Sequence, residues 1–531
     1  MLWVFFLAFV YPPAPDYESV SGYYSTGAGI SYIDGDSIPD IVITNGNDME
    51  AEENHIYFGR GTLPDVNPYV FSSILNYSGH LALGDVNGDG HEDLIIANFS
   101  GYEGGNWIPQ VNLLYLWYDG TFGETPSWTA PDSGRCFSVD VADVNGDGLM
   151  DAAFSCGNNY NSAPEPDRLF LSRGYALDTI PAWETEPTVS YGLAFIDVDM
   201  DGDMDLFVGS SNAPHRLYLN LGGYLDTIPM WLSDSAGDAN QIFVEDIDGN
   251  GYPDVVVTNT YQFSSQERRV EIYFNRGGML ETSPSWTYRT TDYFSTAAAG
   301  DLDGDGDVDL VVGGWWSPIK IFKNRDGVLD PYPSWEWSPE SQYDLVAERI
   351  FLFDVDGAGL VETTDTFVYS SGNAFWLSRR PVHGYPSVYL NGVQIFPPDW
   401  SFHREKGYIF VNSSILNPGD ILTVRYSYST SLDLFVSNWE ESRGNFLFLN
   451  TSLQEPEESA ADVVVRYDNG YLYLNLPDGR EGVPLSLYTA SGRMIYRGYA
   501  EGKKIRIPLR LSAGLYMVRV GDRSALRIVV W

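Results

Sequence analysis

Short apolar runs and polar turns alternate along most of the chain, at a spacing that suits β-strands better than helices. Runs such as DLIIAN, DLFVG and DLVVG are rich in β-branched residues, and each directly follows an acidic loop. This combination of loop and run occurs seven times, at intervals of 49 to 58 residues. Short β-branched runs bounded by Asp- and Gly-rich turns are typical of strands. The pattern therefore predicts an all-β chain built from one repeating unit.

Each repeat contains the same four segments in the same order. A strand enters the acidic loop, the apolar run leaves it, a third strand such as VEIYFNRGG follows, and an outer segment ends in Pro-x-Trp. Four short antiparallel strands per repeat are typical of one blade of a β-propeller, in which ring closure protects the strand edges. We therefore expect a seven-bladed β-propeller between residues 20 and 450.

The tryptophan of the outer segment stands at one fixed place in five repeats. These residues are Trp128, Trp183, Trp231, Trp286 and Trp335. A fixed place in the repeat favours packing between adjacent blades, because aromatic side chains are the largest apolar groups available. A row of sugar-stacking platforms is the alternative interpretation.

The acidic loops are the candidate binding sites. In five of them, oxygen side chains recur at positions 1, 3, 5 and 9, and Gly stands at position 6, as in DVNGDGHED. A hard cation such as calcium takes about six to eight oxygen ligands, which alternate side chains of a tight loop can supply while Gly permits the sharp turn. We expect about five structural Ca²⁺ sites. Their predicted ligands are Asp85, Asn87, Asp89, Asp93, Asp143, Asn145, Asp147, Asp151, Asp197, Asp199, Asp201, Asp205, Asp246, Asp248, Asn250, Asp254, Asp301, Asp303, Asp305 and Asp309.

The strand that follows each loop distinguishes this pattern from an EF-hand. An EF-hand loop needs Glu at position 12 and flanking helices. Position 12 is instead apolar in the five complete copies, as Ile96, Phe154, Val208, Val257 and Val312. A plain hairpin turn is the other alternative, since turns also prefer Asp and Gly. Five complete copies in one register favour calcium.

Two further copies of the loop are incomplete. The first has Tyr32 at position 1. Its remaining candidate ligands are Asp34, Asp36 and Asp40. The last copy, DVDGAGLVE from Asp354, has Ala358 at position 5 and Glu362 at position 9. Because each loop lacks a ligand, we expect weak cation binding or none in these two repeats.

Net charge limits the choice of partners. The 531 residues include 73 acidic and 30 basic side chains, giving a net charge of −43. Nucleic acid is excluded as a partner, because binding it requires a basic stripe that releases counterions from phosphates. Bound divalent cations would offset part of the negative charge.

The N-terminal run MLWVFFLAFV is too short to span a bilayer and is stopped by prolines. We interpret residues 1–15 as a signal peptide; a misplaced start codon and an N-terminal core strand are the alternatives. No later segment is a transmembrane candidate.

Cys136 and Cys156 are the two cysteines of the chain, and they flank the third acidic loop. A hairpin about residue 146 or 147 would place them opposite one another on neighbouring strands. A disulfide is plausible if the protein is exported. Two buried free thiols are an equally good interpretation.

The repeat pattern breaks after Arg380. Residues 381–430 alternate as strands around Asn-Gly and Pro-Gly turns, without an acidic loop, and the exit-strand pattern resumes at Asp433. We expect a small β insertion in the closing blade; a separate module between two propeller fragments is the alternative. The polar residues 451–461 predict a linker. Residues 462–531 predict a compact β-sandwich.

The acidic loops and exit strands resemble the FG-GAP/VCBS repeat over roughly residues 25 to 450. That family forms calcium-binding propeller blades, found also in integrin α-subunit heads and certain fungal lectins. The resemblance implies that the loop oxygens named above are calcium ligands, and it puts metal in doubt at the loops with Tyr32 and Ala358.

The C-terminal segments LYTASGRMIYRG and AGLYMVRV resemble the sorting domain of type IX secretion substrates, over residues 463–531. This second resemblance implies export across the outer membrane of a Gram-negative bacterium, with the secretion machinery as a partner. The protein would then be secreted or held at the outer-membrane surface.

The sequence contains few of the motifs that mark a catalytic site. The six histidines lie in unrelated contexts, with no HExxH and no GxSxG. The scattered Asp and Glu of a glycosidase or lyase have no local signature. We therefore expect a calcium-binding propeller that acts in adhesion or in recognition of glycans or surface proteins. The alternatives are a polysaccharide-degrading lyase or hydrolase on the same scaffold and a passive envelope component.

Overall fold

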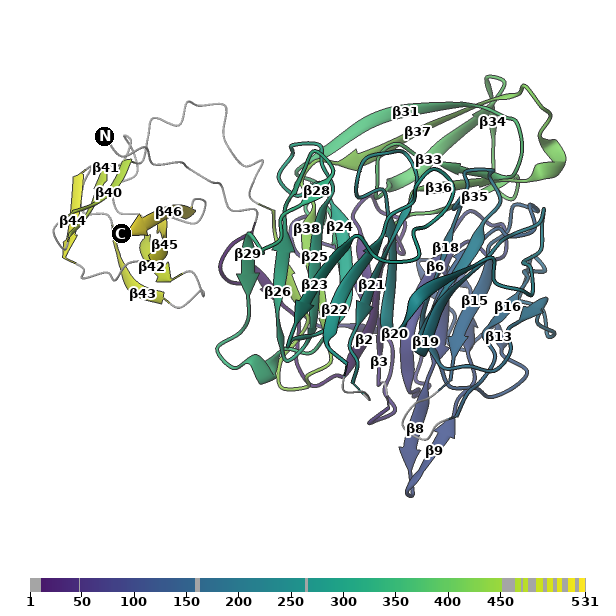
Figure 1. The fold of residues 1–531 in the computed structure, drawn as a ribbon, viewed down its shortest axis with the longest axis horizontal. Helices are drawn as coiled ribbons and strands as arrows, with labels where there is room; N and C mark the ends of the chain where they lie inside the picture. The colour runs from purple at the N-terminus through teal and green to yellow at the C-terminus, as the bar shows by residue number, and fades with distance from the viewer. Residues whose placement is uncertain are drawn as a thin grey trace.

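The computed structural model describes residues 11–46, 48–157, 163–262 and 266–450, together with seven strands between residues 464 and 530. In these parts of the chain the only helical elements are two short 3₁₀ turns, Gln342–Asp344 and Ser413–Ile415. All other regular elements are strands (Figure 1). The all-β prediction is confirmed.

Antiparallel sheets of four strands recur along the chain, each with the strand order expected of a repeat. The first three consist of β2 (Ser25–Ser31), β3 (Asp40–Asn45), β4 (His55–Tyr57) and β5 (Tyr69–Val70); β6 (Ser78–Gly84), β7 (Asp93–Asn98), β10 (Leu113–Tyr115) and β13 (Trp128–Thr129); and β14 (Cys136–Ala142), β15 (Asp151–Cys156), β16 (Arg168–Phe170) and β17 (Trp183–Glu184). A later one consists of β24 (Tyr293–Gly300), β25 (Asp309–Trp315), β26 (Ser317–Phe322) and β29 (Trp335–Trp337).

A six-stranded sheet lies between these groups and combines two repeats. Its strands are β18 (Ser190–Ile196), β19 (Asp205–Tyr218), β20 (Trp231–Glu245), β21 (Asp254–Asn259), β22 (Arg268–Tyr273) and β23 (Trp286–Thr290). The first half of β20 pairs with β19 and its second half with β21. Long β20 therefore serves as the outer strand of one repeat and the first strand of the next. Short hairpins, β8 (Ser100–Glu103) with β9 (Asn106–Pro109), β11 (Trp117–Tyr118) with β12 (Thr121–Phe122), and β27 (Asn324–Arg325) with β28 (Val328–Leu329), extend from the repeats.

The last sheet of the ring contains strands from both ends of the repeat region. Its order is β30 (Ala347–Phe353), β38 (Asp433–Asn438), β39 (Phe446–Phe448) and β1 (Tyr17–Glu18). Each first strand contacts the first strand of the next repeat, and β30 contacts β2. The sheets therefore close into a ring, which protects their edges as a propeller requires. With the six-stranded sheet divided within β20, the described repeats number seven.

Tyr11 belongs to the packed core of this closing sheet. Its side chain is fully buried, its hydroxyl donates to the Leu432 carbonyl at 2.7 Å, and its ring packs edge-on against Trp335. Residues 11–15 fall within the segment interpreted as a signal peptide, and Tyr11, Pro12 and Pro13 of this segment are buried. Residues 1–10 lie outside the described residues.

A lobe of two sheets is inserted between β30 and β38 and lies at one end of the ring, drawn in green in Figure 1. One sheet contains β31 (Leu360–Val368), β37 (Ile421–Ser429), β33 (His383–Leu390) and β34 (Val393–Ile395), and the other contains β32 (Ala374–Trp376), β36 (Tyr408–Val411) and β35 (Trp400–His403). The lobe begins at Leu360 rather than at residue 381, because the strand expected to leave the last acidic loop pairs with β37 along its whole length. It is an insertion within the closing sheet.

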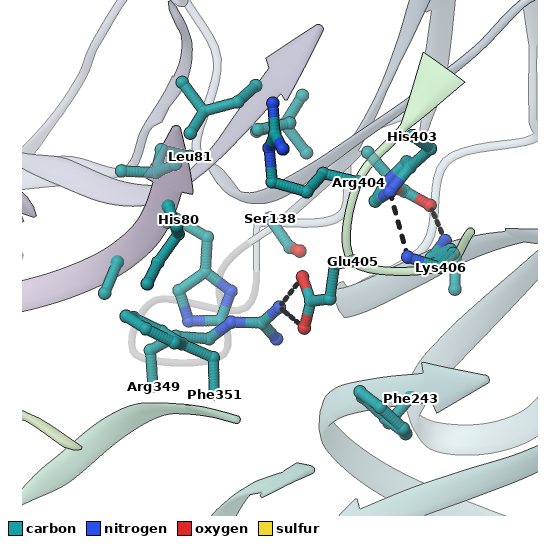
Figure 2. Close-up of a pocket in the computed structure, with 18 of the residues that line it drawn as sticks. His80, Leu81, Ser138, Phe243, Arg349, Phe351, His403, Arg404, Glu405 and Lys406 are labelled. Atoms are coloured by element: carbon teal, nitrogen blue, oxygen red, sulfur yellow. Dashed lines mark hydrogen bonds and ion pairs between the residues drawn. The ribbon is translucent and has the colours of Figure 1, made fainter. Parts of the chain in front are cut away.

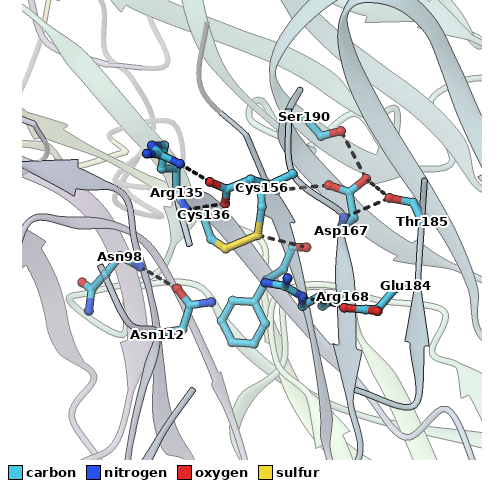
Figure 3. Close-up of a disulfide and its surroundings, with 12 residues drawn as sticks. Asn98, Asn112, Arg135, Cys136, Cys156, Asp167, Arg168, Glu184, Thr185 and Ser190 are labelled. Carbon is cyan, nitrogen blue, oxygen red and sulfur yellow. Dashed lines mark hydrogen bonds and ion pairs between the residues drawn. A yellow bond between two sulfur atoms is a disulfide. The ribbon is translucent and has the colours of Figure 1, made fainter. Parts of the chain in front are cut away.

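Cys136 and Cys156 form a disulfide between β14 and β15 (Figure 3). The two residues face one another in the register of these strands. Of the two interpretations left open by the sequence, the structure has the disulfide and not the free thiols. A crosslink between residues 20 apart removes chain entropy from the unfolded state, a contribution of about 3 kcal/mol to the free energy of unfolding.

The described C-terminal strands form two further antiparallel sheets, as expected of a β-sandwich. They are β40 (Val464–Asp468), β41 (Tyr471–Asn475) and β44 (Lys504–Pro508), and β43 (Met494–Tyr499), β42 (Pro484–Thr489), β45 (Gly514–Val520) and β46 (Ala525–Val530). The expected linker, residues 451–461, lies outside the described residues. None of the described helices has the length and apolar character needed to cross a membrane.

Candidate metal centres

The aspartate at position 9 fastens each acidic loop to the sheet that carries it. In the loop that starts at Asp85, Oδ2 of Asp93 accepts the N–H of Val86 at 3.0 Å, and Oδ1 accepts the N–H of Trp117 at 2.8 Å. One carboxylate therefore joins the start of the loop, the second strand and the end of the third strand. The same two bonds are made by Asp40, Asp151, Asp205, Asp254 and Asp309.

The aspartate at position 1 folds the loop back on itself. Oδ1 of Asp85 accepts the N–H of Gly88 at 2.7 Å, and Oδ2 accepts the N–H of Gly90 at 2.8 Å. Gly90 has a φ of 89°, a region that side chains with a Cβ rarely adopt. The glycine at position 6 is thus required by the turn, as the sequence predicted.

The last acidic loop is completed by Asp433 and not by Glu362, so the assignment of position 9 to Glu362 is wrong. Glu362 is exposed in β31 of the lobe. Oδ2 of Asp433 accepts the N–H of Val355 at 2.8 Å, and its Oδ1 accepts the N–H of Asn450 at 2.7 Å. These are the two bonds of every other closing aspartate. The lobe is therefore inserted inside the loop, and the closing residue follows the lobe.

Carboxylate oxygens converge in four of the loops. Within each set they lie within 4.8 Å of one another, and the sets are Asp197, Asp199 and Asp205; Asp246, Asp248 and Asp254; Asp301, Asp303 and Asp305; and Asp354, Asp356 and Asp433. Donors that are all oxygen suit a hard cation such as Ca²⁺ or Mg²⁺. These groups could hold a metal ion. The fourth set shows that a loop expected to be deficient has three converging carboxylates.

Burial leaves the charge of the carboxylates in the acidic loops poorly compensated. Burial, together with neighbouring carboxylates, raises the pKa of Asp143 and of Asp197 to about 7 and that of Asp205 to about 8. A raised pKa means that the ionised form costs free energy in these surroundings. A divalent cation would supply the missing positive charge, so the residues present fit such a group.

Two loops have a basic side chain against the aspartate at position 3. Arg276 pairs with Asp248 at 2.8 Å, and Lys323 pairs with Asp303. Both basic residues follow the third strand of the same repeat as their partner. Each ion pair occupies a carboxylate oxygen that would otherwise be available to a metal ion in that loop. For a cation to bind there, the basic side chain has to move away, or the aspartate has to contact both the cation and the basic side chain.

The lobe covers some acidic loops and leaves others open. Asn373 donates to Oδ2 of Asp143 at 2.9 Å, and the N–H of Ala374 donates to the Gly202 carbonyl at 2.8 Å. In the loops starting at Asp246 and Asp301, by contrast, the turn glycines have open space beside them within the described part of the chain. Ions in the loops that begin at Asp143 and Asp197 would be covered, and ions in the other two would face solvent.

In three of the loops, an asparagine of the next repeat bonds the loop from outside. Asn275 donates from Nδ2 to the Val198 carbonyl at 2.7 Å, so it reaches position 2 of the preceding loop. Asn220 and Asn324 make the same bond to the loops before them. Loop order is therefore coupled to contact between neighbouring sheets.

The recurrent tryptophans also join neighbouring repeats. The indole N–H of Trp183 donates to the Asp226 carbonyl at 2.8 Å, and that of Trp231 to the Leu280 carbonyl at 3.0 Å. Trp128, Trp183, Trp231 and Trp335 are buried. Their rings are thus part of the packing between repeats and do not serve as exposed sugar platforms.

The substitution Asp433→Asn should lower the free energy of unfolding by about 1–3 kcal/mol, because an amide has one acceptor oxygen and leaves a buried N–H unpaired. It should also remove one bound cation equivalent. Glu362→Gln is the matched control and should change neither quantity. Urea unfolding and cation titration of the full chain measure both. An effect of Glu362→Gln without one of Asp433→Asn would contradict our assignment.

Comparison with known proteins identifies repeats of one family in part of the ring. The family model described as FG-GAP-like repeat matches residues 33–96, 85–154, 197–257 and 260–312, and these segments include acidic loops and their exit strands. No curated protein matches the chain.

Several solved structures are similar to the chain at low sequence identity. The crystal structure of BBS1N in complex with ARL6DN, soaked with lead, is 10% identical with a TM-score of 0.40, over 66% of this chain and 90% of that one. The same complex soaked with mercury is 11% identical with a TM-score of 0.41 over the same shares, 66% and 90%. Rhamnogalacturonan lyase YesW is 15% identical with a TM-score of 0.34, over 61% of this chain and 63% of that one. The matched repeats and the ring of sheets together show FG-GAP-like repeats folded as a β-propeller.

Proposed function

We propose that the protein is a secreted or cell-surface calcium-binding propeller that recognises glycans or surface proteins. The main observation behind this proposal is the geometry of the acidic loops, which recurs around a closed ring. Asn side chains link these loops to the neighbouring sheets. A scaffold of this kind holds its surface turns in fixed positions, which favours binding because little entropy is lost on contact.

Exposed aromatic side chains on the turns beside the acidic loops support a role in recognition. Tyr118, Tyr175 and Tyr224 are 62% to 72% exposed. Gly223, next to Tyr224, lies against Asn145 of the preceding loop. Tyrosine offers a flat apolar ring and a polar end, a combination that suits contact with sugars and proteins. These turns thus place exposed aromatic rings beside acidic loops.

Calcium would act as a structural ion in this proposal. Extracellular calcium modules bind with dissociation constants of about 0.1–1 mM. At millimolar calcium each occupied loop would add up to about 1.4 kcal/mol to the free energy of unfolding. Because each loop touches the next sheet, an ion that orders the loop would also stabilise the contact between repeats.

The histidines favour binding over catalysis. Burial, together with Arg residues nearby, lowers the pKa of His80, His215 and His383 to about 3. These rings are therefore neutral and enclosed near neutral pH, which is a poor setting for proton transfer to a large substrate. A polysaccharide lyase or hydrolase on this scaffold remains the competing hypothesis.

Export is the second part of the proposal, with residues 462–531 as a sorting domain that engages the secretion machinery. The Cys136–Cys156 disulfide supports it, because disulfides persist in oxidising compartments. In a Gram-negative host with that secretion system, deletion of residues 462–531 should retain the chain inside the cell envelope. Cell fractionation, with disulfide formation as the check of folding, measures this. Equal surface display of both chains would count against a sorting role.

Removal of calcium should lower the free energy of unfolding by about 2–4 kcal/mol, summed over several weak sites. Calorimetry or urea unfolding with and without chelator gives the value. Asp301→Asn should reduce the response to calcium, whereas Asp420→Asn, in a lobe turn outside the acidic loops, should not. An unchanged stability on chelation would show that the loops do not hold ions.

A panel of immobilised glycans tests recognition against catalysis. We expect retention of the full chain without new reducing ends or unsaturated products. Tyr224→Ala should weaken retention by about fivefold, the loss typical of a contact residue. Tyr343→Ala, which removes a 68% exposed tyrosine outside these turns, is the matched control. New products would instead support the enzyme, and retention that is equal in all variants would remove the turns from the binding site.

A further inference from the structure

Lys323 departs from the repeat pattern at a position beside one of the acidic loops. It directly precedes Asn324, whose N–H donates to the closing aspartate Asp309 at 2.8 Å. The same place in the other six repeats holds an apolar residue: Phe58, Leu116, Leu171, Leu219, Phe274 or Leu449. The scaffold therefore does not require an ammonium group at this position.

The ammonium group of Lys323 pairs with Asp303, at position 3 of the acidic loop in the same repeat. Both side chains are largely buried, at 17% and 20% exposed, so water and salt weaken the pair less than they would at the surface. Oxygens of Asp303, Asp301 and Asp305 converge within 4.8 Å of one another. Lys323 therefore contacts one member of the set that could hold a metal ion.

Asp303 lacks a bond that its equivalents make within their own loops. In the other six acidic loops, the side chain at position 3 accepts the N–H of position 5, at 2.8 to 3.3 Å. Oδ2 of Asp303 is instead bound to Lys323, and its Oδ1 has no hydrogen-bond partner among the described residues. Asp303 is thus held by the lysine and not by its own loop.

Arg276, the other basic residue on an aspartate at position 3, leaves its loop unchanged. Its partner Asp248 keeps the bond to the N–H of position 5 at 3.2 Å. Arg276 is 52% exposed and also pairs with Glu281, five residues further along the chain. Arginines at the same place in three other repeats make the equivalent pair: Arg60, Arg173 and Arg325. Arg276 is therefore a regular feature of the outer turns, whereas Lys323 is specific to one loop.

A role in holding the lobe does not explain Lys323 either. Arg349 of β30 makes such a contact, because it donates to both carboxylate oxygens of Glu405 in the lobe at 2.8 Å, as Figure 2 shows. Lys323 pairs within its own repeat. The turn glycines of its loop have open space beside them in the part of the chain that the structure describes. The loop that contains the lysine pair is thus open to ions from solvent.

The loop that starts at Asp197 has the same acidic residues without a lysine. Asp stands at positions 1, 3, 5, 7 and 9 both in that loop and in the loop that starts at Asp301. Leu219 takes the place of Lys323, and Asp199 makes the bond to position 5 at 3.3 Å. The two loops therefore offer the same carboxylates, and the lysine distinguishes them.

We propose that Lys323 is a tethered cation that competes with Ca²⁺ and lowers the affinity of the loop that starts at Asp301. Calcium can take the oxygen that Lys323 holds only when the ammonium group leaves it. Its double charge and its need for several oxygen ligands allow calcium to displace the lysine at a higher concentration. This inference rests on the proposed calcium binding, and it identifies a residue that sets the affinity of one loop.

Equilibrium dialysis of the full chain against a series of free calcium concentrations tests the proposal. Lys323→Leu, which restores the apolar residue of the other repeats, should lower the Kd of one site about fivefold, the effect of losing one competing ion pair. The added substitution Asp301→Asn should abolish this gain. Arg325→Leu is the matched control, because it removes the same charge from a neighbouring residue that pairs with Asp330. It should leave the calcium isotherm unchanged.

Urea unfolding in the presence of chelator gives a second readout that does not depend on bound calcium. Lys323→Leu should then unfold at a lower urea concentration than the native chain, because the converging carboxylates lose their counterion. Arg325→Leu should unfold with the native chain. Equal unfolding of all three chains would overturn the role of Lys323 as a counterion.

The dialysis outcomes separate this proposal from calcium binding by the ring as a whole. Calcium binding by the native chain that Lys323→Leu does not tighten would overturn the competition and leave the proposed function intact. An equal gain in Arg325→Leu would overturn it as well, because charge without contact would then be sufficient. Binding by Lys323→Leu alone would support the competition and contradict calcium binding by the native ring. Binding by neither chain would contradict both proposals.

Discussion

A buried carboxylate that accepts two backbone N–H groups is the interaction on which each repeat depends. At Asp254 these groups belong to Ile247 and Asn275, at 2.9 and 2.7 Å, so the loop, the second strand and the end of the third strand meet at one side chain. Bonds to a charged acceptor are strong. Burial nevertheless raises the pKa of Asp254 to about 7, so the two bonds do not fully offset the cost of the charge. The residue that organises the repeat is thus also the one that favours a nearby cation.

The residues that bond the closing aspartate also join one repeat to the next. Asn275, whose N–H binds Asp254, reaches with its side chain to the Val198 carbonyl of the preceding loop. A continuous path of carboxylate, backbone and amide therefore runs from sheet to sheet. At the end of the path β1 pairs with β39, so that the first and last parts of the repeat region share one sheet. These bonds place each such loop in direct contact with the repeat that follows it.

Local pattern was sufficient to predict the strands, the turns and the closing aspartates of the complete loops, because spacing within one hairpin determines them. It failed at the last loop. Glu362 stands at position 9 by count, but the chain enters the lobe at Leu360, and Asp433 returns to close the loop. The signal available was the exit-strand pattern from Asp433, which lacks a loop of its own.

The position of the lobe shows how an insertion can be accepted without loss of the repeat geometry. Phe353 and Asp433 are paired across β30 and β38, so the two ends of the insertion are already neighbours. A long insertion between adjacent ends adds little closure entropy. The lobe then contacts the ring through residues that the repeats do not share, such as Arg404 on Glu92 and Arg380 on Glu245. The aspartates common to all repeats thus build the scaffold. The lobe, through its own contacts, makes one side of the repetitive ring chemically different from the other.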